Sequence, residues 1–258
     1  MKLGLIQGRL TNPKWGFQDC PKDWQSEFNL LPSLGLSHIE WIVTRDSFYN
    51  NPIFFENVNQ HSISSICADN IVSEMITNYD FLNHNLTPIC EAAIRNNIKY
   101  VTIPLLEDSS IENQTKFSEF CNVFPKICDK FSSILFSLET ELSIEKVSKL
   151  LTISNNICLT YDTGNTTSYG VSHKDYINLF NKKISNVHIK DRKKTGESMI
   201  PGTGDTNFKE IFNLLLQKGY SRSFTLQTAR EEPNQEYSTI QKHSKIIRRI
   251  YEKCTQSV

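Results

Sequence analysis

The sequence predicts a single α/β domain over residues 1–258, folded as a closed (β/α)8 barrel. Short β-like runs alternate eight times with longer amphipathic runs, and strict alternation implies parallel strands joined by crossover helices. The length of 258 residues suits such a barrel, which typically needs about 250 residues. An open doubly wound sheet is the main rival, but the first turn, Gln7-Gly8-Arg9, lacks the GxGxxG pattern of that fold.

Period-two alternation or apolar composition marks the eight predicted strands. They are Leu3–Arg9, His38–Thr44, Ile63–Asp69, Tyr100–Leu106, Ile134–Glu141, Ile157–Asp162, Ile184–Lys190 and Ser223–Thr228. The predicted helices follow them in turn. They are Lys22–Leu34, Pro52–Gln60, Thr87–Asn97, Ser110–Phe131, Ser143–Ser154, Ser172–Asn181, Asn207–Lys218 and Glu236–Lys253. Thr87-Pro88 and Ser143-Ile144-Glu145 have the composition of helix starts, and Gly219 that of a helix end.

The composition excludes several classes of protein. Formal net charge is zero, with 28 basic and 28 acidic residues, so charge favours neither nucleic acid nor an anionic membrane as partner. The seven cysteines form no CxxC pair and are expected to be reduced thiols. The apolar run at Met1–Ile6 is too short for a signal peptide, and no stretch approaches the ~20 apolar residues of a membrane span. We expect a cytoplasmic protein.

Polar side chains gather at the carboxyl ends of the predicted strands, where a barrel of this kind builds its site. The clearest case is the seventh strand, in which Val187 and Ile189 alternate with His188 and Lys190 before the glycine-rich stretch Pro201–Asp205. The other strand ends carry Gln7 and Arg9, Glu40, Asp69, Glu139 and Glu141, Asp162, and Gln227 with Arg230. Burying such groups unpaired would cost free energy, so they indicate that the strand ends form a functional site.

Glu139, Asp162 and His188 lie at similar depth on three successive strands. Two carboxylates and an imidazole suit a divalent ion such as Mn²⁺, Zn²⁺ or Fe²⁺. A hydrogen-bonded polar cluster without metal fits the same spacing equally well.

Basic residues near the glycine-rich stretch suggest a subsite for an anion. Lys190, Arg192, Arg9 and Arg230 could converge near Gly202–Gly204, and arginine forks with a glycine-rich loop suit phosphate. The substrate would then be a phosphorylated or otherwise anionic sugar. Alternatively, the arginines pair with neighbouring acidic residues at the rim.

Gln7, Glu40 and Asp69 are further candidates for substrate contacts. Their side chains could orient sugar hydroxyls or metal-bound water, although strand-end carboxylates can equally be structural. His38, which points with Glu40, is a weaker candidate.

The motifs together resemble the xylose isomerase-like TIM barrels, a superfamily of sugar isomerases and epimerases that includes inosose dehydratases and endonuclease IV. The resemblance spans nearly the whole chain. Its motifs are Gly8-Arg9-Leu10, His38-Ile39-Glu40, Leu138-Glu139, Tyr161-Asp162-Thr163-Gly164-Asn165, His188-Ile189-Lys190-Asp191 and Pro201-Gly202-Thr203-Gly204. It implies a divalent cofactor, Mn²⁺, Zn²⁺, Mg²⁺ or Fe²⁺, held by Glu, Asp, His and a second Glu from strands five to eight. The first three correspond to Glu139, Asp162 and His188, whereas the fourth position is Gln227.

Gln227 departs from the family pattern and changes the expected chemistry. A glutamine carbonyl can ligate a hard cation, but it cannot act as a base. The two-base arrangement of the family's epimerases is therefore lost, and losing an anionic ligand predicts weaker or partial metal occupancy. One-base aldose–ketose isomerisation remains open, with Glu139 moving the proton and Lys190 acting as acid or oxyanion partner.

The resemblance thus implies an isomerase or epimerase acting on a small sugar, sugar phosphate or polyol through an enediolate. A dehydratase or lyase on the same scaffold is an alternative, and so is a metal-free, non-catalytic sugar-binding barrel. The DNA-repair relatives need several more histidines at strand ends, so a nucleic-acid partner is not expected. The sequence leaves the choice between monomer and homodimer open.

Overall fold

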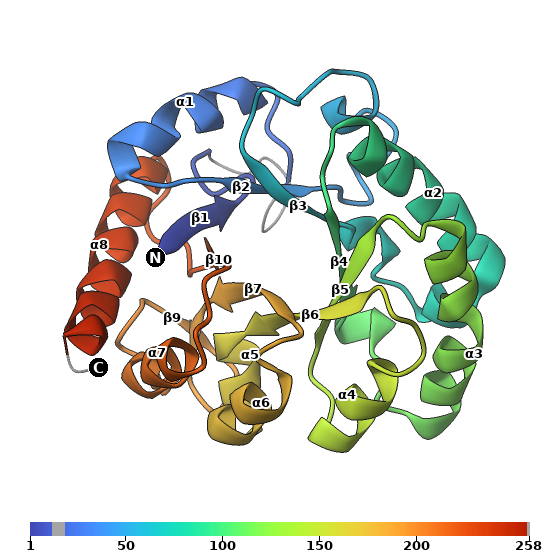
Figure 1. Cartoon of the computed structure of the whole chain (residues 1–258). Helices are drawn as coiled ribbons and strands as arrows, with labels where there is room; N and C mark the ends of the chain where they lie inside the picture. The colour runs from blue at the N-terminus through green and yellow to red at the C-terminus, as the bar shows by residue number, and fades with distance from the viewer. Residues whose placement is uncertain (12–18, 257–258) are drawn as a thin grey trace. The chain divides into compact units, whose positions relative to one another are not determined.

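The predicted barrel is confirmed by the computed structural model, which describes residues 1–11 and 19–256. Eight strands form a closed barrel in the order β1-β10-β7-β6-β5-β4-β3-β2, and β8 and β9 pair separately. The chain divides into two compact units, Met1–Ile39 with Tyr161–Val258, and Glu40–Thr160. Figure 1 labels the helices and strands of both units. That the chain is one domain stays a prediction.

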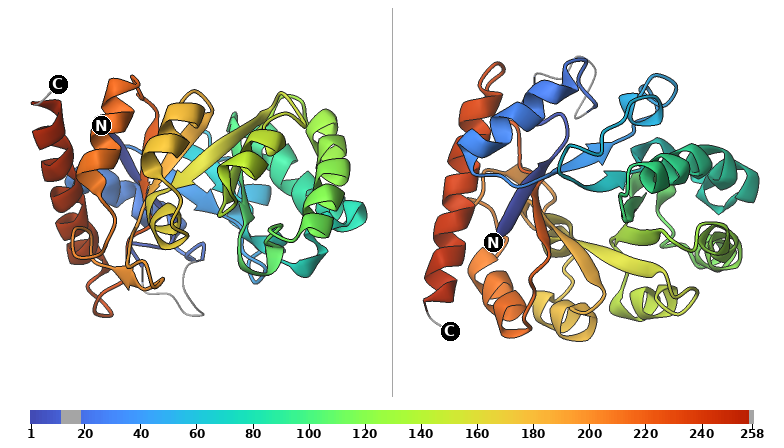
Figure 2. Two further views of the ribbon diagram at one scale, coloured as in Figure 1. Left: turned by 90° about the horizontal axis from the view of Figure 1, so that it is seen from below. Right: turned by 45° about the horizontal axis from the view of Figure 1, so that its top comes forward.

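The first unit combines the start of the chain with its last third. Its elements are β1 (Lys2–Ile6), α1 (Trp24–Leu34), α5 (Thr163–Ser168), α6 (His173–Phe180), β7 (Ile184–Ile189), β8 (Asp191–Arg192), β9 (Ser198–Met199), α7 (Phe208–Gln217), β10 (Ser223–Leu226) and α8 (Glu236–Thr255). Figure 2 shows the long helix α8 beside α7, and α8 also contacts α1. Edge-to-face contacts of Phe212, Phe224 and Tyr251 join α7, β10 and α8 into an apolar layer.

β1, β10 and β7 run parallel with fixed register, and this register decides which side chains share a face. Gly4 lies beside Thr225, which lies beside His188. A Cβ at Gly4 would come within 2.4 Å of the His38 ring, so only glycine leaves room for this histidine. His38 Nε2 is 3.3 Å from Thr225 Oγ1, which donates to Asn186 Oδ1. His38 therefore belongs to a hydrogen-bonded layer beneath the strand ends.

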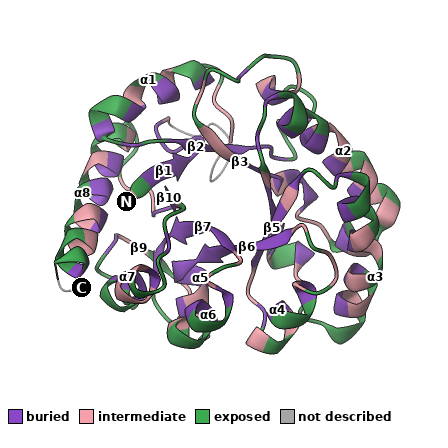
Figure 3. Ribbon diagram, in the orientation of Figure 1, coloured by how far each residue is buried: buried purple, intermediate pink, exposed green. Residues whose placement is uncertain are grey.

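The second unit holds the middle of the chain. Its elements are β2 (Ile39–Ile42), η1 (Pro52–Phe54), β3 (Ile63–Cys67), η2 (Asp69–Ile71), η3 (Glu74–Thr77), α2 (Tyr79–Arg95), β4 (Tyr100–Leu105), η4 (Glu107–Ser109), α3 (Gln114–Lys130), β5 (Leu135–Thr140), α4 (Ile144–Leu150) and β6 (Ile157–Asp162), and β2 and β6 cross the unit boundaries. Phe120, Phe124 and Phe136 pack α3 onto β5. Figure 3 shows the strands of both units buried and the helices exposed on their outer faces.

Two predicted helices of the second unit differ from the structure. Helix α2 begins at Tyr79 rather than Thr87, because the Asn78 side chain accepts the N–H of Phe81 and caps the helix there. The Thr87-Pro88 pair, predicted as a helix start, lies inside α2. The predicted helix Pro52–Gln60 is wrong beyond the single turn of η1, since the chain then bends to bring Val58 N–H onto Asn96 Oδ1.

The other predicted boundaries lie closer to those of the structure. Strand β6 matches its prediction to the residue, and the other strands end one to three residues early. Helix α5 was not predicted because Thr163–Ser168 has the composition of a loop, and the β8–β9 hairpin was also missed. Ser143 caps α4 and Gly219, with φ +69°, follows the end of α7, as predicted. No helix in the described ranges is long and apolar enough to span a membrane.

Candidate functional site

The polar face of β7 and β10 lies at the centre of the candidate site. Thr225 pairs with His188, and Gln227 N–H donates to the carbonyl of Ile189 at 3.0 Å, which places Gln227 beside Lys190. His188, Lys190 and Gln227 are 0, 7 and 8 % exposed. The alternation predicted for the seventh strand therefore buries His188 and Lys190 at its carboxyl end, beside Gln227 after β10.

Asp162 and Lys190 form a buried ion pair at the ends of β6 and β7. Lys190 Nζ lies 3.9 Å from Asp162 Oδ2, while Asp162 Oδ1 accepts the N–H of Asn165 at 2.7 Å and caps α5. Thr163 Oγ1 bonds to both the N–H and the carbonyl of Lys190 and fixes its backbone. Among the described residues, Asp162 Oδ2 accepts no hydrogen bond. This buried carboxylate oxygen is thus oriented for a ligand.

Glu139, Asp162 and His188 form a candidate metal-binding group. Each offers one ligand atom, and these atoms all lie within 4.8 Å of one another. Strand register explains the approach of the carboxylates, because Glu139 on β5 pairs with Thr160 on β6 and Asp162 follows two residues later on the same face. Two carboxylates and an imidazole are ligands that suit a divalent transition ion.

Gln227 supplies a second buried oxygen of the same kind. Its Oε1 is buried and has no hydrogen-bond partner in the part of the chain that the structure describes. An unsatisfied buried acceptor costs free energy, so this oxygen is available to a cation or to a hydrogen-bond donor that enters the site. Together with Asp162 Oδ2, it gives the site acceptors that fit a cation or donating hydroxyl groups.

In the second unit, the two predicted contact residues differ in surroundings. Glu40 on β2 is completely buried and accepts the Thr102 hydroxyl at 2.6 Å, so β4 orients this carboxylate. Asp69 lies two residues beyond β3, at the first position of η2, and is partly exposed. Glu40 is therefore positioned by a neighbouring strand, whereas Asp69 belongs to the rim.

The loop after β1 carries Arg9 and is fixed by Glu27 and Arg230, whose contacts with this loop the sequence motifs do not predict. The carboxylate of Glu27, on α1, accepts the N–H groups of Gly8 and Leu10, both at 2.9 Å. Burial raises the pKa of Glu27 to about 7, although these two hydrogen bonds lower it. Arg230 donates to the carbonyls of Gly8 and Thr11 on the same loop.

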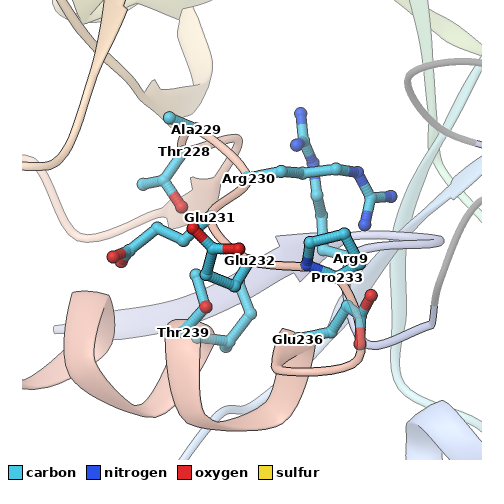
Figure 4. Close-up of a pocket in the computed structure, with 10 residues that line it drawn as sticks. Arg9, Thr228, Ala229, Arg230, Glu231, Glu232, Pro233, Glu236 and Thr239 are labelled. Carbon is cyan, nitrogen blue, oxygen red and sulfur yellow. The ribbon is translucent and has the colours of Figure 1, made fainter.

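Arg9 itself lies against a small cavity of about 150 Å³ (Figure 4). Arg230, Glu231, Glu232 and Glu236 also line this cavity. Burial, together with the nearby Arg230, lowers the pKa of Arg9 to about 9. Three carboxylates on the wall oppose a phosphate here, so the two arginines brought together by the fold do not form a simple anion site. Gln7 lies in the turn before Arg9 and is fully buried.

Replacing Glu27 should test whether this carboxylate stabilises the Arg9 loop. In Glu27→Ala, the Gly8 and Leu10 N–H groups lose their acceptors, and we expect the free energy of unfolding at pH 8 to fall by about 3 kcal/mol. Denaturant unfolding measures this change. The control is Glu252→Ala, an exposed position on α8, which should stay within about 0.5 kcal/mol of wild type. Equal effects of the two substitutions would contradict the role of Glu27.

The glycine-rich stretch is organised by Asp191. The N–H groups of Gly202 and Gly204 donate to Asp191 Oδ2 at 2.7 and 3.0 Å, and Thr206 N–H donates to Oδ1 at 3.2 Å. These N–H groups are the ones expected to bind phosphate, and in the structure they bind a carboxylate of the protein. Arg192 lies beside them, its N–H donating to Thr206 Oγ1. The N–H groups of Gly202, Gly204 and Thr206 are therefore occupied by Asp191.

His173 supports the β6 end from α6. Its Nδ1 is 2.5 Å from Tyr161 Oη and its Nε2 is 3.0 Å from Thr167 Oγ1. Burial lowers the pKa of His173 to about 4. Because the unfolded chain takes up the proton near pH 6.5, the contribution of neutral His173 is present above pH 6.5 and is lost as the pH falls towards 4.

We therefore expect wild type to lose about 2 kcal/mol more stability than His173→Gln between pH 7 and pH 5. Denaturant unfolding at the two pH values gives this difference. His84→Gln, at an exposed position, serves as control and should follow the wild-type profile. A His173→Gln profile parallel to that of wild type would contradict the prediction.

The barrel and its group of candidate ligands at the strand ends point to a class of protein. The family model for the xylose isomerase-like TIM barrel matches residues 79–249, about two thirds of the chain. The protein therefore belongs to the xylose isomerase-like TIM barrel family. No curated protein matches the sequence.

Solved structures agree with this assignment at low sequence identity. L-ribulose 3-epimerase is 13% identical, with TM-score 0.74 over 99% of this chain and 96% of that one. The IolI protein, solved with a bound zinc atom, is 14% identical, with TM-score 0.73 over 100% and 99%. The 3-keto-D-glucoside 4-epimerase YcjR from E. coli is 15% identical, with TM-score 0.68 over 96% and 99%. These likenesses establish the fold.

Proposed function

We propose that the protein is a divalent-metal-dependent enzyme that moves a proton alpha to the carbonyl of a small sugar, as an isomerase or epimerase. The observation that carries the proposal is the group of Glu139, Asp162 and His188, with ligand atoms within 4.8 Å of one another. Family membership and similarity to an epimerase that acts on L-ribulose support the substrate class. The zinc atom bound to IolI supports a metal of this type.

Each residue has a distinct role in this proposal. Asp162 and His188 hold the ion with Glu139, and Gln227 offers a neutral fourth oxygen. The ion, when bound, would polarise the substrate carbonyl and acidify the neighbouring C–H group. Glu139 takes the proton from one carbon and returns it to the next. The Lys190 ammonium, held 3.9 Å from Asp162, stabilises the oxyanion of the enediolate.

The structure favours an uncharged sugar over a sugar phosphate. The N–H groups of Gly202 and Gly204 are used by Asp191, and Arg230 is used by the carbonyls of Gly8 and Thr11. The predicted phosphate subsite therefore has few donors left. Gln7, Glu40 and Arg9, all buried on or just beyond strands, would instead bind the hydroxyl groups of the substrate.

Metal binding and proton exchange test this proposal together. Protein purified without chelators should bind one equivalent of Mn²⁺, Zn²⁺, Mg²⁺ or Fe²⁺ in calorimetric titration. The metal-loaded protein should then catalyse the exchange of deuterium from D2O into ketoses such as L-ribulose, at the carbon beside the carbonyl. NMR follows this exchange. A protein that binds none of these ions would overturn the proposal and favour a sugar-binding barrel without catalysis. Elimination of water during exchange would identify a dehydratase.

A further inference from the structure

A separate cavity lies on the second unit, lined by aromatic side chains. Its volume is about 480 Å³, within the range of small-molecule sites. Phe48, Tyr49, Phe54 and Phe55 contribute to its wall, and we call it the aromatic pocket. Their rings form a chain of edge-to-face contacts, with centroids 5.2 to 6.3 Å apart. Tyr49 and Phe55 are each 74% exposed, an unusual state for large aromatic residues.

The segment that carries these rings is held in place by hydrogen bonds to β2 and α2. Asn51 is completely buried, accepts the Trp41 indole N–H at 2.8 Å and donates to the Ile42 carbonyl at 2.9 Å. Arg95, at the end of α2, donates to the carbonyls of Ile53 and Phe54, both at 2.9 Å. The exposed rings are therefore presented on a fixed support, so a ligand would bind with little loss of conformational freedom.

The rest of the lining, contributed by α2 and α3, carries one lysine and no carboxylate. Lys130, on α3, donates to Asn83 Oδ1 at 2.7 Å and to Thr87 Oγ1 at 3.0 Å, and both partners also line the aromatic pocket. Lys130 Nζ also lies 5.1 Å from the centroid of the Phe131 ring. Its two printed hydrogen bonds go to neutral oxygens, so its positive charge can attract an anionic ligand at the pocket. The lining residues contain no Asp or Glu, and Lys130 is the lysine among them.

From this combination we infer that the aromatic pocket binds a small aromatic molecule that carries one anionic group, such as a carboxylate or sulfonate. The aromatic ring of the ligand would stack on Tyr49 and Phe55, and its anionic group would bind Lys130. The aromatic pocket is concave and has the size of one such molecule, whereas a stable contact with a second copy of the chain needs about 800 Å² per partner. The inference does not depend on the chemistry proposed for the strand ends.

A pair of fluorescent probes tests both parts of this inference. Anilinonaphthalene sulfonate is aromatic and anionic, and N-phenyl-1-naphthylamine is a similar molecule without the charge. We expect saturable binding of the sulfonate at one site on the native protein. The double variant Tyr49→Ser/Phe55→Ser should weaken it at least about tenfold. Lys130→Met should weaken the sulfonate about twofold to fivefold and leave the neutral probe unchanged.

Matched controls separate the aromatic pocket from general surface effects. Tyr169→Ser removes another exposed aromatic side chain, in the first unit, and Lys126→Met removes another lysine of α3. Both should bind the probes like wild type. Binding that is absent, or unaffected by the double variant, would overturn the inference. So would a wild-type dimer in sedimentation that the double variant dissociates, because a second copy would then occupy the aromatic pocket.

Discussion

Glu139→Gln should lower the rate of α-proton exchange by about a thousandfold, within the range expected for loss of a general base. The side chain is 3% exposed, and glutamine preserves its shape while removing the group that accepts the proton. The folded state should not be weakened, because the substitution removes a charge from a buried group that already contains Asp162. Exchange of a ketose in D2O, followed by NMR, gives the rate, and thermal unfolding confirms the fold.

A comparison with Asp162→Asn separates the base from the ligands. Both substitutions remove an anionic ligand, so both should weaken metal binding. Saturating Mn²⁺ should restore much of the exchange in Asp162→Asn, because that variant keeps Glu139. It should not restore exchange in Glu139→Gln. The control Glu141→Gln, two residues along and outside the candidate metal group, should retain nearly full activity. Exchange by Glu139→Gln within tenfold of wild type would show that another residue is the base.

The sequence was sufficient to predict the barrel because its signals are local. The apolar run Ile157–Asp162 matches β6 to the residue, and the helix start predicted at Ser143 is confirmed by its capping hydrogen bond. Local signals also misled, since Pro88 lies inside α2 and not at its start. Helix α5 depends on tertiary contacts. Its Gly164 lies so close to the Lys190 stem that a Cβ would come within 2.9 Å of it.

The candidate ligands were predictable for a similar reason. In a parallel barrel, equivalent strand ends meet at one edge, so the spacing of Glu139, Asp162 and His188 along the chain was enough to bring them together. The roles of Glu27 and Asp191 were not predictable in this way. Glu27 lies on a helix 19 residues from the N–H group of Gly8 that it binds, and Asp191 binds a loop that returns to it only in the folded chain. Such contacts depend on loop paths, for which the sequence carries no periodic signal.

Gln227→Glu should raise the affinity for Mn²⁺ or Zn²⁺ by about tenfold to a hundredfold. The buried Oε1 of Gln227 has no hydrogen-bond partner among the described residues, and a carboxylate there would add a negative charge at the end of β10, beside Lys190. Without metal, the same substitution should lower the unfolding temperature, because it buries another carboxylate at the strand ends. Saturating metal should therefore raise the unfolding temperature more in the variant than in wild type.

Calorimetric titration and thermal unfolding with and without metal measure these two effects, and Gln217→Glu, at an exposed position on α7, is the control. If wild type and Gln227→Glu bind metal equally, Gln227 does not face the ligand group. Metal binding by the variant alone would mean that the natural glutamine leaves the strand-end site without an ion, which contradicts the proposed enzyme. A measurable wild-type affinity that the variant increases would show that Gln227 weakens a working site. That result would favour one-base isomerisation by Glu139, because the neutral oxygen can ligate but cannot move a proton.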